Sequence, residues 1–224
     1  LVRRYVDDHP DRRVAVLSVD PSKRRTGGAL LGDRIRFNSL LSGRVFMRSL
    51  ATRQSGSEVS AALADAIALY KGAGFDLVLA ETSGIGQADA SIVELVDRSI
   101  YVMTPEFGAQ SQLEKIEMID LADFVVVNKY DKPGALDAVR DVGKAYQRAH
   151  RRFDQSPSDM PVFATMSSQF NDRGVNALYA SLTRALDAMS EAGAHTRGRF
   201  ADLREEGAPR RDHVIPPKRV RYLS

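Results

Sequence analysis

The sequence contains no cysteine, and only four of its 224 residues are histidine. Without cysteine the chain has no disulfide framework, no cysteine-ligated zinc site and no thiol nucleophile. The histidines are scattered along the chain and do not suggest a metal cluster. A reducing compartment, the cytoplasm, is therefore the location that the composition favours.

Long apolar runs are also missing. No stretch has the length of a membrane-spanning helix, and no basic start is followed by the apolar core and cleavage site of a secretion signal. The net charge of +3 comes from arginines that are mostly interleaved with carboxylates, and aromatic residues make up only 7% of the chain. We therefore expect a solvated surface, with neither a membrane nor a nucleic acid as partner.

The chain does contain a regular alternation of apolar runs and helical patterns. Runs with the length of buried parallel strands occupy residues 14–19, 75–80, 99–103, 124–127 and 161–166. Helical patterns occupy residues 55–71, 110–121 and 136–151 and a final stretch near 175–191. This order predicts an α/β fold, a doubly wound and mostly parallel sheet whose ligands bind beyond the carboxyl ends of the strands.

The composition changes near residue 192. Residues 1–191 are expected to form one domain, since a chain of this size with 43% hydrophobic residues can bury a sizeable core. Residues 192–224 are polar and rich in glycine, proline and arginine. We interpret them as a linker or tail that leads towards a following domain, rather than as a nucleic-acid-binding arm.

The stretch "VVVNKYDKPG", residues 125–134, predicts a guanine-binding loop. The carboxylate of Asp131 can accept hydrogen bonds from N1 and N2 of guanine, a donor pair that adenine lacks, and such a pair is worth about 1–3 kcal/mol of discrimination. The stem of Lys129 can cover the base, and Asn128 can tie loops together. Ser167 and Ser168 follow the last predicted strand, where backbone donors could meet the guanine oxygen. The alternative is an ordinary surface turn.

Two further segments suit phosphates and a metal ion. In "ETSGIGQ", residues 81–87, an acid at a strand end precedes two glycines that allow close approach to a terminal phosphate, and Glu81 would hold Mg²⁺ directly or through water. Asp20 and Asp33 flank a basic, glycine-rich loop that suits a polyphosphate and its metal, or a switch that the nucleotide orders. The alternatives are a capped strand-to-helix turn and a solvated charged loop.

A phosphate-cradling loop of the form GxxxxGK[ST] does not occur in the sequence. The first residues, "LVRRYVDDHPDRRVAVLSVD", read as the end of a helix followed by a strand. In a phosphate-loop fold the helix after the cradle would end here. We therefore expect the first strand and the cradle to lie upstream of Leu1, in a longer polypeptide.

Together these segments are similar to the GTPase chaperones that serve adenosylcobalamin-dependent acyl-CoA mutases. The resemblance rests on "VAVLSVDPS", "TGGALLGDRIRFNSL", "ETSGIGQ" and "VVVNKYDKPGA" and covers nearly the whole chain. "RVFMRSLATRQSG" and "VIPPKRVRYLS" look most like the GTPase domain of fused isobutyryl-CoA mutases. The resemblance implies GTP or GDP with Mg²⁺ as ligands.

The resemblance also implies roles for individual residues. It assigns Mg²⁺ to Val19 (through its backbone), Asp20, Asp33, Glu81 and Thr82. It assigns the nucleotide to Arg36 and the guanine loop, Asn128, Lys129, Tyr130 and Asp131. Residues 106–115 look like an extra switch that senses the mutase, although Ala109 stands where stand-alone relatives carry an aspartate. The switch candidates are Arg36, Gln87 and Lys115, and no catalytic residue is assigned.

For the parent protein the resemblance implies interconversion of isobutyryl-CoA and n-butyryl-CoA on adenosylcobalamin. The GTPase domain would gate cofactor loading and protect the mutase, with cobalamin-binding and acyl-CoA-binding domains on the same polypeptide and a homodimeric parent. This chain alone is expected to bind GTP weakly and to hydrolyse it negligibly. Two alternatives stay open, namely a GTPase that delivers a metal such as nickel, and a non-catalytic interaction module with an incomplete nucleotide site.

Overall fold

The computed structural model describes residues 1–21, 43–52, 62–82, 90–108, 113 and 116–189. Its described strands form two parallel, three-stranded sheets with the orders β2-β1-β3 and β4-β5-β6. The first sheet contains β1 (Val14–Pro21), β2 (Val45–Thr52) and β3 (Leu77–Thr82). The second contains β4 (Ile100–Met103), β5 (Phe124–Val127) and β6 (Val162–Ala164).

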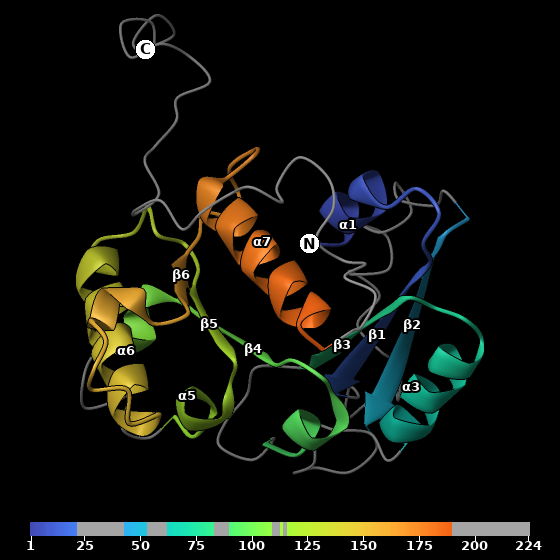
Figure 1. Ribbon diagram of the computed structural model, residues 1–224, viewed down its shortest axis with the longest axis horizontal. Coiled ribbons are helices and arrows are strands. Elements are labelled where there is room, and N and C mark those ends of the chain that lie inside the picture. Colours follow the sequence, from blue (N-terminus) through green and yellow to red (C-terminus); the bar gives the residue numbers. More distant parts are fainter. Residues whose placement is uncertain (22–42, 53–61, 83–89, 109–112, 114–115, 190–224) are drawn as a thin grey trace, which may run out of the picture.

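Helices cover these sheets, as Figure 1 shows. The α-helices are α1 (Val2–Asp8), α3 (Ala62–Gly72), α5 (Met118–Leu121), α6 (Ala135–Ala149) and α7 (Arg173–Asp187). Of the short 3₁₀-helices, the described residues include η2 (Ala90–Leu95), η3 (Pro105–Phe107) and η4 (Pro157–Asp159), which lie in the connections. Among the described helices, none combines the length and apolarity that a membrane span requires.

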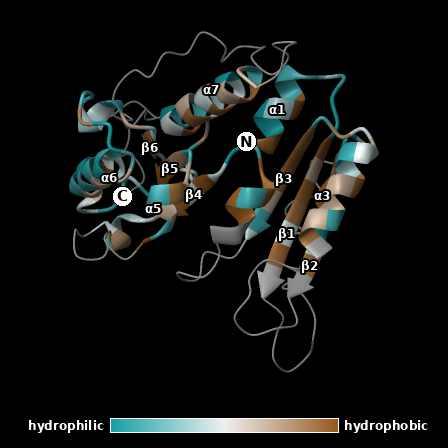
Figure 2. Ribbon diagram, turned by 60° about the horizontal axis from the view of Figure 1, so that its bottom comes forward, coloured by the Kyte–Doolittle hydropathy of each residue, from teal (hydrophilic) through white to brown (hydrophobic). Residues whose placement is uncertain are grey.

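Both faces of β1 and β5 are buried, which explains their continuous apolar sequences. Val14 and Val16 of β1 pack with α1 and with Tyr179 of α7. Leu17 and Val19, on the opposite face, pack with Leu63 of α3. In the same way β5 alternates between clusters with α6 and with α7. Figure 2 shows the apolar strands inside and polar surfaces on α1 and α6. The predicted doubly wound α/β fold is therefore confirmed.

Helix α7 packs on both sheets and so joins them. Its Leu178 and Leu182 pack on β5 and β6 of the second sheet, whereas Tyr179 packs on the first sheet. Figures 1 and 2 place β3 and β4 at the edges where the two sheets face each other. In the part of the chain that the structure describes, no ladder joins these two strands. The side chain of Val102 in β4 is 58% exposed although its strand is apolar.

The structure also corrects two details of the predicted element order. Strand β2, in "VFMRSLAT", has no counterpart in the prediction. The helix predicted over residues 110–121 is not continuous, because Ile116 and Glu117 interrupt it between Leu113, which is helical, and α5. The interruption is a sequence of tight turns in which Ile116 N–H donates to Leu113 and Ile119 N–H to Ile116, each bond spanning three residues. The other predicted strands match within two residues.

Candidate nucleotide-binding site

The predicted site residues gather at the carboxyl ends of parallel strands. Asn128 directly follows β5, and the loop after β6 carries Ser167 and Ser168. Glu81 and Thr82 end β3 in the other sheet, and Thr82 is paired with Val19 of β1. Because parallel strands within a sheet end at the same edge, the members of each group lie at one edge of their own sheet, where the predicted site would have its two halves.

In the second sheet, Asn128 is the centre of the group of predicted site residues. Its Oδ1 atom accepts hydrogen bonds from the hydroxyl of Thr165 (3.1 Å), the N–H of Ser167 (3.1 Å) and the hydroxyl of Ser167 (3.0 Å). Its own N–H donates to the carbonyl of Met103, at the end of β4, across 2.8 Å. Asn128 thus ties together the ends of three strands, the role that the sequence predicts for it.

The loop after Asn128 has a tightly defined backbone. Lys129 adopts the left-handed conformation with φ of 58°, which is costly for a residue other than glycine. The N–H of Tyr130 donates to the carbonyl of Thr165 (3.0 Å), and the N–H of Lys132 donates to Lys129 (3.0 Å). Lys129 and Asp131 are exposed while Asn128 is half-buried. The backbone of the loop is therefore held by hydrogen bonds, while the side chains of Lys129 and Asp131 are exposed to solvent.

The loop after β6 is held by Asp172, a residue that the sequence analysis missed. Asp172 is buried at the N-terminus of α7, and its carboxylate accepts from the N–H groups of Met166 (3.2 Å) and Val175 (2.9 Å). An aspartate at the helix start is a signal that could have revealed it. Thr165, 1% exposed, had no such signal. The amide of Ser167 is already bonded to Asn128, which leaves Ser168 as the predicted backbone donor to guanine.

The predicted metal ligands belong to the first sheet and its loops. Among them, only Val19, Glu81 and Thr82 have side chains that the structure describes. Glu81 is exposed and Thr82 is half-buried at the end of β3. Asp20 continues β1 beyond Val19, but its side chain lies outside the described part, as do Asp33, Arg36, Gln87 and Lys115. Within the described residues, no group of three or more histidine, aspartate or glutamate side chains is placed to hold a metal.

These positions nevertheless fit magnesium by the chemistry of their donors. Carboxylates, a hydroxyl and a backbone carbonyl are the hard oxygen ligands that Mg²⁺ prefers. The pairing of Val19 with Thr82 brings the main chain preceding Asp20 beside the end of β3. The assignment of Mg²⁺ to these residues stays a prediction.

The positive charges of the guanine loop influence a carboxylate on η3. The pKa of Glu106 is lowered, first by a hydrogen bond from the side chain of Thr104 and by one from its own backbone, and further by the positive charges of Lys129 and Lys132. Glu106 is fully exposed. The guanine loop and η3 are therefore electrostatic neighbours.

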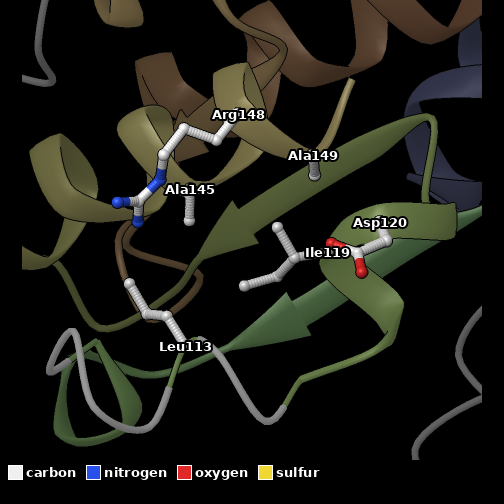
Figure 3. Close-up of a pocket in the computed structure, with 6 residues that line it drawn as sticks. All are labelled: Leu113, Ile119, Asp120, Ala145, Arg148 and Ala149. Atoms are coloured by element: carbon white, nitrogen blue, oxygen red, sulfur yellow. The ribbon is translucent and has the colours of Figure 1, made fainter. Parts of the chain in front are cut away.

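A separate cavity of about 370 Å³ opens between α5 and α6. Figure 3 shows Leu113, Ile119 and Ala145 directed into it and the charged groups of Asp120 and Arg148 around it. It lies on the C-terminal half of α6, about 15 Å of helix away from the guanine loop at the helix start. The cavity contains none of the predicted nucleotide or metal ligands.

Comparison with known families adds a second line of information. The model of the family described as "Methylmalonyl Co-A mutase-associated GTPase MeaB" matches residues 8–211 of this chain. The chain belongs to this family. The family assignment agrees with the resemblance that the sequence motifs predict.

Relatives of this MeaB-family chain include fused isobutyryl-CoA mutases. A fused isobutyryl-CoA mutase from Geobacillus kaustophilus is 53% identical over 99% of the chain, and one from Nocardia farcinica is 52% identical over all of it. The chain spans only about a fifth of the length of either protein. The methylmalonic aciduria type A homolog of Caenorhabditis briggsae is 32% identical over 87% of the chain and 47% of its own length.

Among solved structures, the MeaB-family chain resembles HypB from Helicobacter pylori, which was crystallised in complex with nickel. The TM-score is 0.51, with 18% identity, 74% of this chain covered and 71% of HypB. At that identity the similarity concerns the fold alone, and it agrees with the predicted architecture of a phosphate-loop GTPase.

Proposed function

We propose that this chain is the guanine-nucleotide-binding part of a GTPase chaperone for a cobalamin-dependent acyl-CoA mutase. The observation that carries the proposal is the hydrogen-bond network of Asn128, which holds the loop from Lys129 to Asp131 at the carboxyl ends of β4, β5 and β6. A loop fixed in this way is preorganised to recognise a base. Membership of a family of mutase-associated GTPases supports the same reading.

In this proposal the carboxylate of Asp131 accepts hydrogen bonds from N1 and N2 of guanine. The stem of Lys129 covers one face of the base, and the amide of Ser168 donates to the guanine oxygen. Tyr130 and Ser167 position the loop, since the Tyr130 amide is bonded to Thr165 and the Ser167 amide to Asn128. An adenine would leave the Asp131 carboxylate without its donors, which a recognition site penalises strongly.

The phosphates would lie between the two halves of the site. Mg²⁺ would be held by Asp20, Asp33, Glu81, Thr82 and the carbonyl of Val19, and would neutralise charge that develops on the phosphates during hydrolysis. A phosphate-cradling strand from a longer polypeptide would pair with the edges of β3 and β4. The half-buried β3 and the exposed Val102 of β4 support this position for it.

The wider role follows from the relatives rather than from this chain alone. The fused mutases that are 52–53% identical support mutase domains, cobalamin-binding and acyl-CoA-binding, as the partners. We propose in addition that nucleotide binding gates cofactor loading and protects the mutase, as the resemblance of the sequence motifs implies. Isomerisation of isobutyryl-CoA would belong to those domains. Metal delivery is not favoured, because the likeness to HypB is limited to the fold.

The substitution Asp131→Asn in the full-length protein tests the guanine assignment. Xanthine carries a carbonyl where guanine carries its 2-amino group, so an asparagine side chain can donate to xanthine but cannot accept both guanine donors. The expected result is a loss of GTP affinity of at least about tenfold and a gain in affinity for xanthosine triphosphate. Asp137→Asn, an exposed carboxylate on α6 that pairs with Arg140, is the control and should change neither. Equal, measurable GTP affinities for both variants would overturn the assignment of Asp131 to guanine. Absence of GTP binding by both the unmodified protein and Asp137→Asn would favour an interaction module without a nucleotide site.

A further inference from the structure

We propose that Gly108 is a positioning residue of the guanine site, through which the segment after β4 controls the placement of the loop from Asn128 to Gly134. This inference rests on the proposed function, because it concerns how that loop is held. It is carried by two contacts at opposite ends of the loop, both made by the short segment from Met103 to Gly108.

The first contact fixes the start of the loop. The carbonyl of Met103, the last residue of β4, accepts the N–H of Asn128 across 2.8 Å. The chain then turns at once into η3, where Phe107 N–H donates to Thr104 (3.1 Å) and Gly108 N–H donates to Pro105 (3.0 Å). These bonds make the segment compact, so a displacement of Gly108 is passed to Met103.

The second contact fixes the end of the loop. Gly108 is buried against Ala138 in the first turns of α6, and a side chain on Gly108 would overlap the Cβ of Ala138. The added Cβ would also lie 2.9 Å from the Cα of Ala138 and 3.2 Å from the carbonyl oxygen of Pro105. Because backbone atoms are involved on both sides, the neighbours cannot yield by a simple side-chain rotation.

Glycine is required at position 108 because there is no room for a side chain, and not because of the backbone conformation. Its φ of −82° and ψ of 0° are accessible to every residue type. The contact is passed on to the loop because the N–H of Ala138 donates to the carbonyl of Gly134 (2.9 Å), the residue that joins the loop to α6. Gly134 itself is left-handed, with φ of 77°, a conformation that favours glycine.

Charge on η3 adds to this coupling. The lowered pKa of Glu106 reflects, after its own hydrogen bonds, the positive charges of Lys129 and Lys132 in the loop. The segment therefore acts on the guanine loop by a hydrogen bond at its start, by close packing on α6 just beyond its end and by charge between them. Binding of a guanine base and the position of η3 are accordingly coupled, and the link is the close contact at Gly108.

The substitution Gly108→Ala in the full-length protein tests this inference, with Gly72→Ala as the matched control. Gly72 ends α3, and a Cβ added there meets no atom within 4 Å. The readouts are affinities for GDP and for inosine diphosphate, whose base lacks the 2-amino group that Asp131 recognises. We expect Gly108→Ala to weaken GDP binding about tenfold and to reduce the preference for GDP over inosine diphosphate, because the loop is displaced. Gly72→Ala should change neither value.

The double variant Gly108→Ala/Ala138→Gly separates the contact from a general loss of folding. Removing the methyl group of Ala138 makes room for the new one, so GDP affinity and base preference should recover most of their loss. Gly108→Ala with unchanged GDP affinity and unchanged base preference would overturn the inference, and so would a double variant as weak as the single one.

Hydrogen exchange on the unmodified protein gives a second test that needs no variant. GDP should slow exchange of the Gly108 amide, which is bonded to Pro105, whereas ADP should not. An unchanged Gly108 amide in the presence of bound GDP would contradict the coupling. An unmodified protein that does not prefer GDP to ADP would instead refute the proposed function, so the two failures are distinguishable.

Discussion

The hydroxyl of Thr165 donates a hydrogen bond to Oδ1 of Asn128 across 3.1 Å, although 37 residues separate the two in the sequence. Thr165 is 1% exposed, and its carbonyl accepts the N–H of Tyr130. One buried residue therefore holds the guanine loop at two positions, Asn128 and Tyr130. This arrangement makes Thr165 a target that affects base recognition without touching the base.

Thr165→Val should weaken guanine-nucleotide binding by roughly three- to tenfold, since it removes one of three donors to Asn128 while keeping the side chain's shape. The loss of one such bond corresponds to about 1 kcal/mol. Thr183→Val is the matched control, because its buried hydroxyl donates only to carbonyls of its own helix, those of Tyr179 and Ala180. Calorimetric titration with GDP should separate the two variants. Equal affinities would mean that Thr165 does not support the loop.

Gly174→Ala should strongly destabilise the fold. A Cβ at Gly174 would overlap the carbonyl oxygen of Ala164 at the end of β6 and approach the Asp172 carboxylate at 3.2 Å. Relief requires α7 to move away from the sheet, which we expect to cost at least about 3 kcal/mol in the free energy of unfolding. Gly72→Ala should change it by no more than about 0.5 kcal/mol. Urea unfolding curves provide the measurement, and similar midpoints for both variants would contradict the packing described.

The carboxyl group of Glu106 should titrate below its ordinary value of 4.5 in the folded protein. A folded-state pKa below the unfolded value means that the stabilisation is present above the unfolded pKa and is lost as the pH falls through the folded pKa. Carbon NMR of the side-chain carboxyl against pH gives the value directly. Thr104→Val should move it upward, because the hydrogen bond from Thr104 is the largest cause. A titration at or above 4.5 would contradict this environment.

Val102→Cys tests whether a strand lies between β3 and β4 in the full-length protein. The chain has no cysteine, so a thiol introduced here can be followed without background from these residues. Val102 and Leu69 are 58% and 67% exposed in the present structure. In the longer protein Val102→Cys should react with a maleimide much more slowly than Leu69→Cys, as located by peptide mass. Equal rates would show that the edge of β4 is uncovered.

The elements predicted best are those with a continuous apolar sequence. Strand β5 was predicted at its observed bounds because all four of its residues are apolar and buried, so polar residues mark both of its ends. Strand β2 was missed because Arg48 and Ser49 interrupt its apolar sequence. Such polar residues are tolerated because β2 lies at the edge of the sheet, with β1 as its described neighbour. The interrupted helix before β5 was misread because Leu113, Ile116 and Ile119 share a helical spacing that successive tight turns satisfy equally well.

For the site, the sequence revealed the groups at the strand ends but not the residues that hold them. Asn128 and Asp131 are recognisable because their chemistry is tied to a local motif. Thr165 acts through tertiary contacts between distant segments, and the importance of Gly108 depends on the spacing between η3 and α6. Neither contact leaves a local pattern. The predicted ligands Asp33 and Arg36 and the switch candidates Gln87 and Lys115 lie outside the described residues and stay predictions.

The position of α7 has a consequence for how the protein is made. Arg4 Nε donates to Asn176 Oδ1 across 2.7 Å, and Tyr179 completes the cluster formed by Val2, Tyr5 and Val14. The first sheet therefore cannot finish its core until α7 has been synthesised. Arg4 and Asn176 are 172 residues apart in the sequence, so the cluster that α1 begins stays incomplete until α7 leaves the ribosome, at roughly 5–20 residues per second. Chains that end before α7 lack Tyr179 and leave the apolar side chains of this cluster without one of their partners.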